Sequence, residues 1–354
     1  VTKAPSDEFE GNLKLSAGNY GSYSAGIALS GPASDAVNYR FAVEQYNSDG
    51  FIENDYLNTD DTNNRDELTV RGKLTIDATE DLDINLNIMH FDFDNGYDAF
   101  SLDNTRHTLS DTPGVDKQET SAVSAQFNYR GLDGIYFQTL VSLADTELGY
   151  GYDEDWSNPT LCLENDCPYG DYASTDYYAR DKAANTLEFR FSSNEGNAIF
   201  NGTTSWVAGV YVKQEDEDLS REYTYLASDF TSTFEADSFA VFAQFDSQLS
   251  TKTILTTGLR YETRDASYSN SDGFDEDLSD NALGGKLVLS HQLDDDNMVF
   301  AGVHRGYKAG GANTDGTLPD ELRTFNPEYL WNYEVGYKAS LLNGDAYFAA
   351  TAFY

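Results

Sequence analysis

Aromatic and basic side chains in the polar stretches of this chain are its strongest candidates for binding chemistry. Tyrosine and tryptophan offer a flat apolar face with a polar edge, which suits a planar organic chelate, while arginine or lysine complements a negative charge on it. The candidates on this ground are Tyr97, Arg106, Tyr152, Trp156, Tyr223, Tyr225, Tyr307 and Lys308. The same residue types form the belt at a membrane interface, and for Trp331 and Tyr333 we favour that interpretation.

Enzymatic signatures are absent from the sequence. It contains no Gly-x-Ser-x-Gly elbow, no Walker phosphate loop and no His-Glu-x-x-His pair. Two glycines, Gly310 and Gly311, follow Lys308 closely, but the strand-to-helix context of a phosphate cradle is missing. We therefore expect neither an enzyme nor a resident cofactor.

The charge of the chain is strongly negative. It carries 61 Asp and Glu against 22 Lys and Arg, a net charge of -39, which argues against a nucleic-acid partner. Acidic clusters occur at 60–61, 153–155, 215–218 and 275–277, but none has the spacing of a twelve-residue calcium loop. Solvated surface charge is the favoured interpretation, and bound calcium or bridging to anionic outer-leaflet lipid is the alternative.

The elements that must position these residues are strands, and residues 325–342 show the pattern most clearly. Every second residue from Tyr329 to Leu341 is apolar or aromatic, while the residues between are largely polar or charged. Side chains alternate faces along a strand, so this segment has one apolar face. Its length matches the ~9 to 11 residues that a tilted strand needs to cross a bilayer.

The chain contains about fifteen such strands with no helical period between them, although two, 298–308 and 346–354, alternate poorly. Short turns and long polar connections also alternate, the long ones being expected at 47–66, 94–117, 149–180, 216–236, 267–280 and 309–326. Short turns on one side and long loops on the other are typical of a transmembrane barrel. The sequence thus predicts an all-β, antiparallel transmembrane β-barrel, while the facing of 298–308 and 346–354 stays open.

Within the strands, the basic residues occupy the alternate positions that carry polar side chains. A charge that faces mid-bilayer lipid costs ~2 to 4 kcal/mol, so these side chains are expected to line the lumen. They are Arg71, Lys73, Arg130, Arg190, Arg260, Arg264, Lys286 and Lys338. Pairing with carboxylates such as Glu188, Glu262 and Glu334, or with a plug domain, is the favoured role, and ligand binding is the alternative.

Several segments resemble one family, the TonB-dependent receptors of Gram-negative outer membranes, in particular its iron-complex branch. Residues 1–5 (VTKAP) resemble the end of the family's plug domain, and 18–22, 30–32 and 39–40 resemble the start of its barrel. Residues 305–311 (RGYKAGG), 325–328 (FNPE) and 332–338 (NYEVGYK) are similar to its late-barrel motifs. The motifs bracket the chain in the correct order.

This resemblance implies a barrel of about 22 strands with a plugged lumen, of which the chain supplies roughly the first two thirds. Residues 1–8 would end the plug and 9–354 would begin the barrel, so the plug and the last strands are expected to be missing and the sheet to be open. The implied partners are a ferric siderophore or similar chelate, TonB acting through the plug, and outer-membrane lipid. The alternatives are a passive porin-like channel, a structural or adhesive barrel, or a receptor for cobalamin, haem or oligosaccharide.

The cell-surface location that the resemblance implies makes a disulfide the natural interpretation of the only two cysteines, Cys162 and Cys167. A zinc site would need more ligands. The four histidines, at 90, 107, 291 and 304, are scattered and show no zinc spacing, so no metal site is expected from the sequence.

Overall fold

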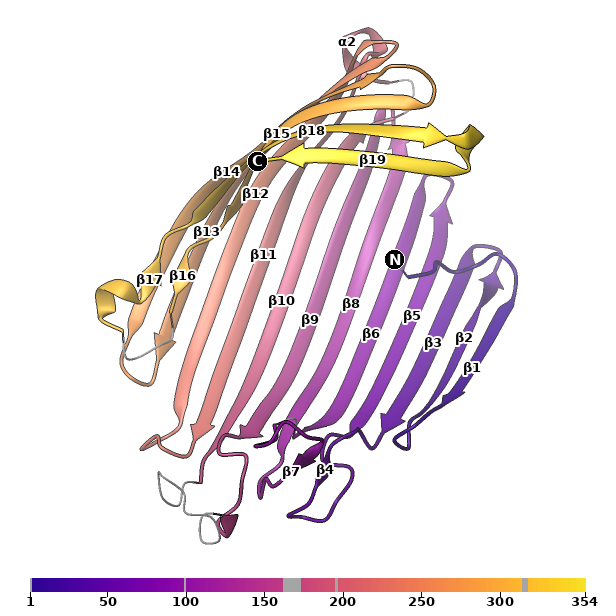
Figure 1. The fold of residues 1–354 in the computed structure, drawn as a ribbon. Coiled ribbons are helices and arrows are strands. Elements are labelled where there is room, and N and C mark those ends of the chain that lie inside the picture. Colours follow the sequence, from indigo (N-terminus) through magenta and orange to yellow (C-terminus); the bar gives the residue numbers. More distant parts are fainter. Residues whose placement is uncertain (1, 99, 162–172, 195–196, 314–317) are drawn as a thin grey trace.

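The main element of the fold is one antiparallel sheet of fifteen strands (Figure 1). Each strand is hydrogen-bonded to the strand of this sheet that precedes or follows it in sequence. The computed structural model describes residues 2–98, 100–161, 173–194, 197–313 and 318–354. The strands of this sheet are β1 (Glu10–Ala17), β2 (Tyr23–Ser34), β3 (Val37–Ser48), β5 (Arg65–Thr79), β6 (Leu82–Tyr97), β8 (Gly114–Leu132), β9 (Ile135–Asp153), β10 (Thr175–Ser193), β11 (Thr204–Tyr223), β12 (Phe230–Ser250), β13 (Thr253–Asn270), β14 (Asp275–Gln292), β15 (Asn297–Lys308), β18 (Glu328–Leu341) and β19 (Ala346–Phe353).

Four two-residue strands lie in the connections: β4 (Glu53–Asn54) pairs with β7 (His107–Thr108), and β16 (Gly311–Ala312) pairs with β17 (Thr324–Phe325). The helices of the described residues are short: α2 (Ile199–Gly202), η1 (Asp320–Leu322) and η2 (Leu342–Gly344). Within the described residues, no helix has the length and apolar character needed to cross a membrane.

The prediction of about fifteen strands in an open, curved sheet is confirmed. β1 and β19 end the strand order and are not paired with each other, and the sheet coils between them (Figure 1). The strands are held together because each inner strand pairs with a neighbour on both sides through backbone hydrogen bonds. The outer sides of β1 and β19 have no neighbouring strand in the sheet.

The strand register places the predicted lumen residues on one face. Lys73 lies opposite Asn87, and Lys213 lies opposite Ser238, which in turn lies opposite Arg264. Directly opposed residues share a face, and following these pairs across the sheet puts all eight basic residues of the predicted set on that side. We name this side the polar face; that it lines a lumen stays a prediction.

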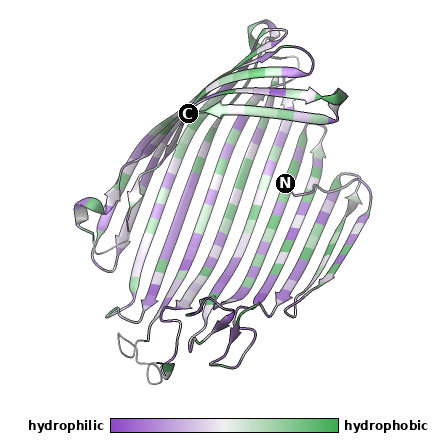
Figure 2. Cartoon of the chain, in the orientation of Figure 1, coloured by the Kyte–Doolittle hydropathy of each residue, from purple (hydrophilic) through white to green (hydrophobic). Residues whose placement is uncertain are grey.

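The opposite face is apolar and exposed, and Figure 2 shows the resulting alternation of hydrophobic and hydrophilic bands along the strands. Among its exposed side chains are Ile88, Leu143, Val241, Leu259, Leu287 and Val335. The two strands whose facing the sequence left open follow this scheme. Val303 pairs with Tyr333 and Ala350 pairs with Tyr337, so Val303 and Ala350 share the apolar face.

The expected loop lengths need correction, because several strands are longer than the sequence pattern indicates. The expected connection at 216–236 is reduced to 224–229, and that at 267–280 is reduced to 271–274. On the short-turn side, β10 ends at Ser193 and β11 begins only at Thr204, with α2 between them, so this connection is longer than a tight turn. Acidic residues such as Asp216, Asp218 and Asp277 consequently lie in strands.

Candidate functional site

The binding candidates gather where the strands approach the long connections, although not all lie in loops as expected. Tyr97, Tyr152 and Tyr223 lie at the ends of β6, β9 and β11, and Tyr307 and Lys308 end β15. The remaining candidates, Arg106, Trp156 and Tyr225, lie outside the strands. The ends of long strands position most of these side chains, which gives them a more rigid support than a loop would.

Aromatic rings from two strands and two loops form a cluster beside a hollow of about 670 Å³, named here the aromatic hollow. Phe100 and Trp156 stack with ring centroids 4.8 Å apart and planes inclined by 13°. Tyr150 packs edge-on against Tyr97 at 5.0 Å, and Tyr152 lies 6.4 Å from Phe100. Such a lining presents flat apolar surface together with hydroxyl groups, which suits a planar ligand.

Trp156 is held in the aromatic hollow by an aspartate turn. The carboxylate of Asp153 accepts hydrogen bonds from the backbone N–H groups of Asp155, at 3.1 Å, and Trp156, at 3.2 Å. Trp156 itself adopts a positive φ of 55°, a conformation that needs such local support in a residue other than glycine. Burial raises the pKa of Asp153, the last residue of β9, to about 6.

A fixed arginine, Arg221, packs on Tyr178, which lines the aromatic hollow. Arg221 donates two hydrogen bonds to Asp176, from Nε at 2.8 Å and from Nη2 at 2.7 Å, and its guanidinium lies over the rings of Tyr178 and Tyr223. Arg180, which lines the hollow, lies over Tyr178 as well and pairs with Glu217 at 3.3 Å. Stacking and bidentate pairing together fix the orientation of the Arg221 guanidinium plane.

A second hollow of about 740 Å³ adjoins the first, since Arg180 lines both, and we name it the basic hollow. Its charged lining consists of Arg180, Lys213, Arg260, Arg264 and Lys308 against Glu215, Glu217 and Glu262. Five cations against three carboxylates form a positive site in a chain of net charge -39. A concentration of cations against the overall charge favours an anionic ligand.

Two of these cations are not neutralised by carboxylates. Lys213 pairs with Glu215 at 2.5 Å and Arg260 with Glu262 at 2.6 Å. In the described part of the chain, neither Arg264 nor Lys308 has an ion-pair partner within 4.0 Å; Arg264 donates instead to the backbone oxygen of Gly310 at 3.2 Å. Their charges remain available to a ligand.

Tyr307 joins the basic hollow through a polar network. Its hydroxyl donates to Glu262 Oε2 at 2.9 Å and accepts from Arg260 Nε at 3.1 Å. The ring of Tyr211 lies beneath the Arg260 guanidinium at 5.1 Å. Of the residues predicted from the sequence, Lys308 thus lines the basic hollow and Tyr307 hydrogen-bonds to its lining, while Tyr152 and Trp156 line the aromatic hollow. Tyr97 packs behind that second lining, against Tyr150 and Phe100.

The other candidates lie apart from the two hollows or outside the described residues. Arg106 donates to the hydroxyl of Tyr20 at 2.7 Å and lies over the ring of Phe51, so it stabilises contacts between loops. Tyr225 packs edge-on against Tyr223. The predicted disulfide between Cys162 and Cys167 falls outside the described residues.

Sequence reasoning missed Asp176, Arg180 and Arg221 because it assigned 149–180 and 216–236 to loops. With those segments recognised as strands, their parity would have placed Arg180 and Arg221 beside Tyr178 on one face. It also missed Glu53, Asp55 and His107, which the structure brings together from two separate connections. No local spacing signals this last group.

Comparison with known proteins shows the family. The model of the family described as TonB dependent receptor-like, beta-barrel matches residues 5–354. No curated protein matches the chain in a sequence search. The family is described as a β-barrel, in agreement with the fifteen antiparallel strands of the sheet.

Solved structures share the fold at low sequence identity. The ferric yersiniabactin uptake receptor FyuA from Yersinia pestis superposes with a TM-score of 0.82 at 19% identity, covering 99% of this chain and 55% of that one. The alcaligin outer-membrane receptor FauA from Bordetella pertussis gives 0.73 at 14%, covering 99% and 52%. The ferric preacinetobactin receptor BauA from Acinetobacter baumannii gives 0.73 at 15%, covering 99% and 55%. The chain therefore spans about half the length of these structures.

Proposed function

Because this chain belongs to the TonB-dependent receptor β-barrel family of Gram-negative outer membranes, we propose that it is part of a receptor for the active uptake of a ferric siderophore. The protein would bind the iron-loaded chelate at the long-connection side of the sheet. TonB would supply the energy through a plug domain, and the role would be transport rather than catalysis.

The observation that carries the proposal is the pair of adjoining hollows, one lined by aromatic rings and the other by an excess of cations. A ferric siderophore commonly joins flat chelating groups to a net negative charge, so the two linings would complement different parts of one ligand. The three receptors above are named for ferric yersiniabactin, alcaligin and ferric preacinetobactin, in accord with this choice.

Transport is tested in cells. We would express the full-length protein in a Gram-negative host that lacks its own siderophore receptors and measure accumulation of radioactive iron from a panel of ferric chelates. The proposal predicts saturable uptake of at least one chelate that disappears when TonB is deleted. Uptake that is unsaturable and independent of TonB would instead indicate a passive channel.

The concentration dependence of uptake separates binding at the hollows from energy coupling. A double variant, Arg264→Gln with Lys308→Gln, should reduce saturable uptake at low chelate concentration and be rescued at high concentration, because it weakens binding without affecting energy coupling. The control is Arg130→Gln, since Arg130 ion-pairs with Asp83 near the short turn at residues 133–134. Equal loss in both variants would argue against the hollows as the binding site.

A further inference from the structure

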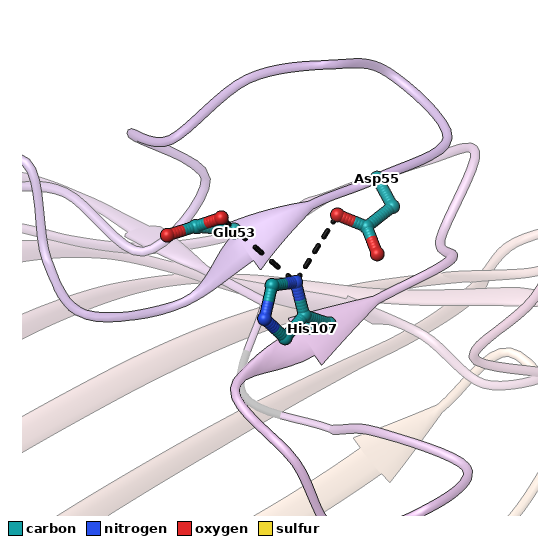
Figure 3. A group of neighbouring side chains, drawn as sticks. All are labelled: Glu53, Asp55 and His107. Carbon is teal, nitrogen blue, oxygen red and sulfur yellow. Dashed lines mark hydrogen bonds and ion pairs between the residues drawn. The ribbon is translucent and has the colours of Figure 1, made fainter.

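A cluster of three potential metal ligands lies in the long connections, apart from the two hollows. Glu53 and Asp55 come from the connection between β3 and β5, and His107 comes from the connection between β6 and β8 (Figure 3). His107 Nδ1 lies 3.1 Å from Asp55 Oδ1 and 3.8 Å from Glu53 Oε2. One ligand atom from each residue lies within 4.8 Å of the others.

These separations suit one shared ion. Zinc binds histidine nitrogen and carboxylate oxygen at ~2.0 to 2.2 Å, which places two ligands of a tetrahedral site about 3.4 Å apart. The two distances from His107 bracket that value. A set of one imidazole and two carboxylates is also a chemical match for a divalent transition metal, whereas calcium and magnesium prefer oxygen alone.

The backbone fixes the three side chains on one side of a small parallel sheet. Glu53 pairs with His107 across β4 and β7, and the backbone N–H of Asp55 donates to Thr108 O at 3.0 Å. Successive residues of a strand point to opposite sides, so Glu53 and Asp55 lie on the same side with Asn54 between them pointing away. Figure 3 shows both carboxylates directed at the imidazole.

Buried polar residues lock the small sheet from beneath. Asn54 and Thr108, which alternate with the three ligands, are each 1% exposed. Asn54 donates to Asp98 Oδ2 at 3.1 Å and to Ser110 O at 2.9 Å, and Thr108 Oγ1 donates to Asp98 Oδ1 at 3.2 Å. Fully satisfied buried networks hold one geometry, so the ligands are preorganised although they are exposed themselves.

We propose that Glu53, Asp55 and His107 bind one divalent transition-metal ion, with water or a ligand from outside in the remaining coordination positions. The ion would bridge the connection between β3 and β5 to that between β6 and β8. This site is independent of the proposed siderophore uptake, because none of the three residues lines either hollow.

The test is titration of the full-length protein in detergent with Zn²⁺, in competition with a chelating dye that removes weakly held ions from the many surface carboxylates. We expect one equivalent of Zn²⁺ to stay bound to the protein in the presence of the dye. His107→Ala should abolish it, and Glu53→Gln and Asp55→Asn should each weaken it by about tenfold or more. The matched control is His304→Ala, because His304 Nε2 lies 3.0 Å from a single carboxylate, that of Glu334, and should leave the equivalent in place.

Titration with Co²⁺ gives a second readout that does not depend on the stability of a variant. Binding as proposed produces visible d–d absorption of the bound Co²⁺. One equivalent of Zn²⁺ displaces the Co²⁺ and removes this absorption. Variant folding is checked by the heat-dependent electrophoretic mobility typical of barrels. A resistant equivalent that survives in folded His107→Gln, or no resistant equivalent in the parent protein, would overturn the proposal and leave the cluster as an ion pair only.

Discussion

Arg221 and Asp176 form a two-point ion pair between neighbouring strands, with Nε–Oδ1 at 2.8 Å and Nη2–Oδ2 at 2.7 Å. The Asp176 side chain is 2% exposed and that of Arg221 is 32% exposed. The pair joins β10 to β11 where both strands extend toward the long connections, and it orients the guanidinium plane between Tyr178 and Tyr223.

We expect Asp176→Ala to loosen the ends of β10 and β11. Removing one partner of a fully buried pair costs ~3 to 5 kcal/mol, and the partial exposure of Arg221 reduces the expected loss to about 2 kcal/mol. Hydrogen exchange of the flanking amides measures the loss of protection. Arg190→Ala serves as the control, because Arg190 pairs with Glu188 on its own strand; equal loosening at this end of the sheet in both variants would contradict the interpretation.

Arg264 and Lys308, which have no ion-pair partner among the described residues, should dominate recognition of an anionic chelate. Replacing Arg264 or Lys308 by Gln removes a charge that is free to bind the ligand, at a cost of roughly 1.4 kcal/mol or about tenfold in Kd for each. Titration of the parent protein and both variants with the ferric chelate measures these changes in Kd. Lys213→Gln is the comparison, because Glu215 already neutralises Lys213, and a larger effect there than at Arg264 would count against the assignment.

A charged substitution should be destabilising on the apolar face and tolerated on the polar face. Leu259, 58% exposed, lies on the apolar face, and Thr256 lies on the polar face of the same strand beside Asp246, to which its hydroxyl donates a hydrogen bond. Leu259→Lys should cost ~2 to 4 kcal/mol in lipid and reduce the folded protein in the outer membrane. Thr256→Lys should assemble at nearly the parent level, which electrophoretic mobility of membrane fractions reports; the reverse order would mean that the faces are exchanged.

The pKa of His107 should be raised from the ordinary histidine value in metal-free protein. A hydrogen bond to Asp55, and then the charges of Asp55 and Glu53, raise the pKa of the imidazole. Because the folded pKa is raised, the contact is fully stabilising below the unfolded pKa near 6.5 and is lost as the pH rises through the folded value. Histidine NMR in the presence of a chelator measures this, and Asp55→Asn should return the pKa toward 6.5; an unchanged pKa in that variant would contradict the assigned cause.

The sequence predicts the strands well because side-chain alternation is a local signal wherever one face meets lipid and the other does not. It fails where both faces meet water. The end of β11 from Asp216 onward carries polar residues on both sides, so no alternation marks it, yet it pairs with β10 and β12 up to Arg221. That error placed Arg221 in a supposed loop, and the assignment of 149–180 to a loop did the same for Asp176.

The cluster of Glu53 and His107 illustrates a second limit. Its residues come from different connections, and two residues of parallel pairing, supported by the buried Asn54, bring them together. Neither spacing nor periodicity along the chain encodes a contact of that kind. By contrast, Tyr307 and Lys308 are candidates by residue type alone; in the structure Lys308 lines the basic hollow and Tyr307 donates a hydrogen bond to Glu262, which also lines it.

The most direct test of the account is a fluorescence titration of the full-length protein in detergent with a panel of ferric siderophores and their iron-free forms. Trp156 stacks on Phe100 in the aromatic hollow, so a bound chelate should quench its emission. We predict saturable, submicromolar quenching by a ferric chelate, weak or absent with the iron-free form, and greatly reduced in Trp156→Phe but not in Trp331→Phe. No quenching by any chelate, together with solute conductance in planar bilayers, would contradict the account and indicate a passive channel.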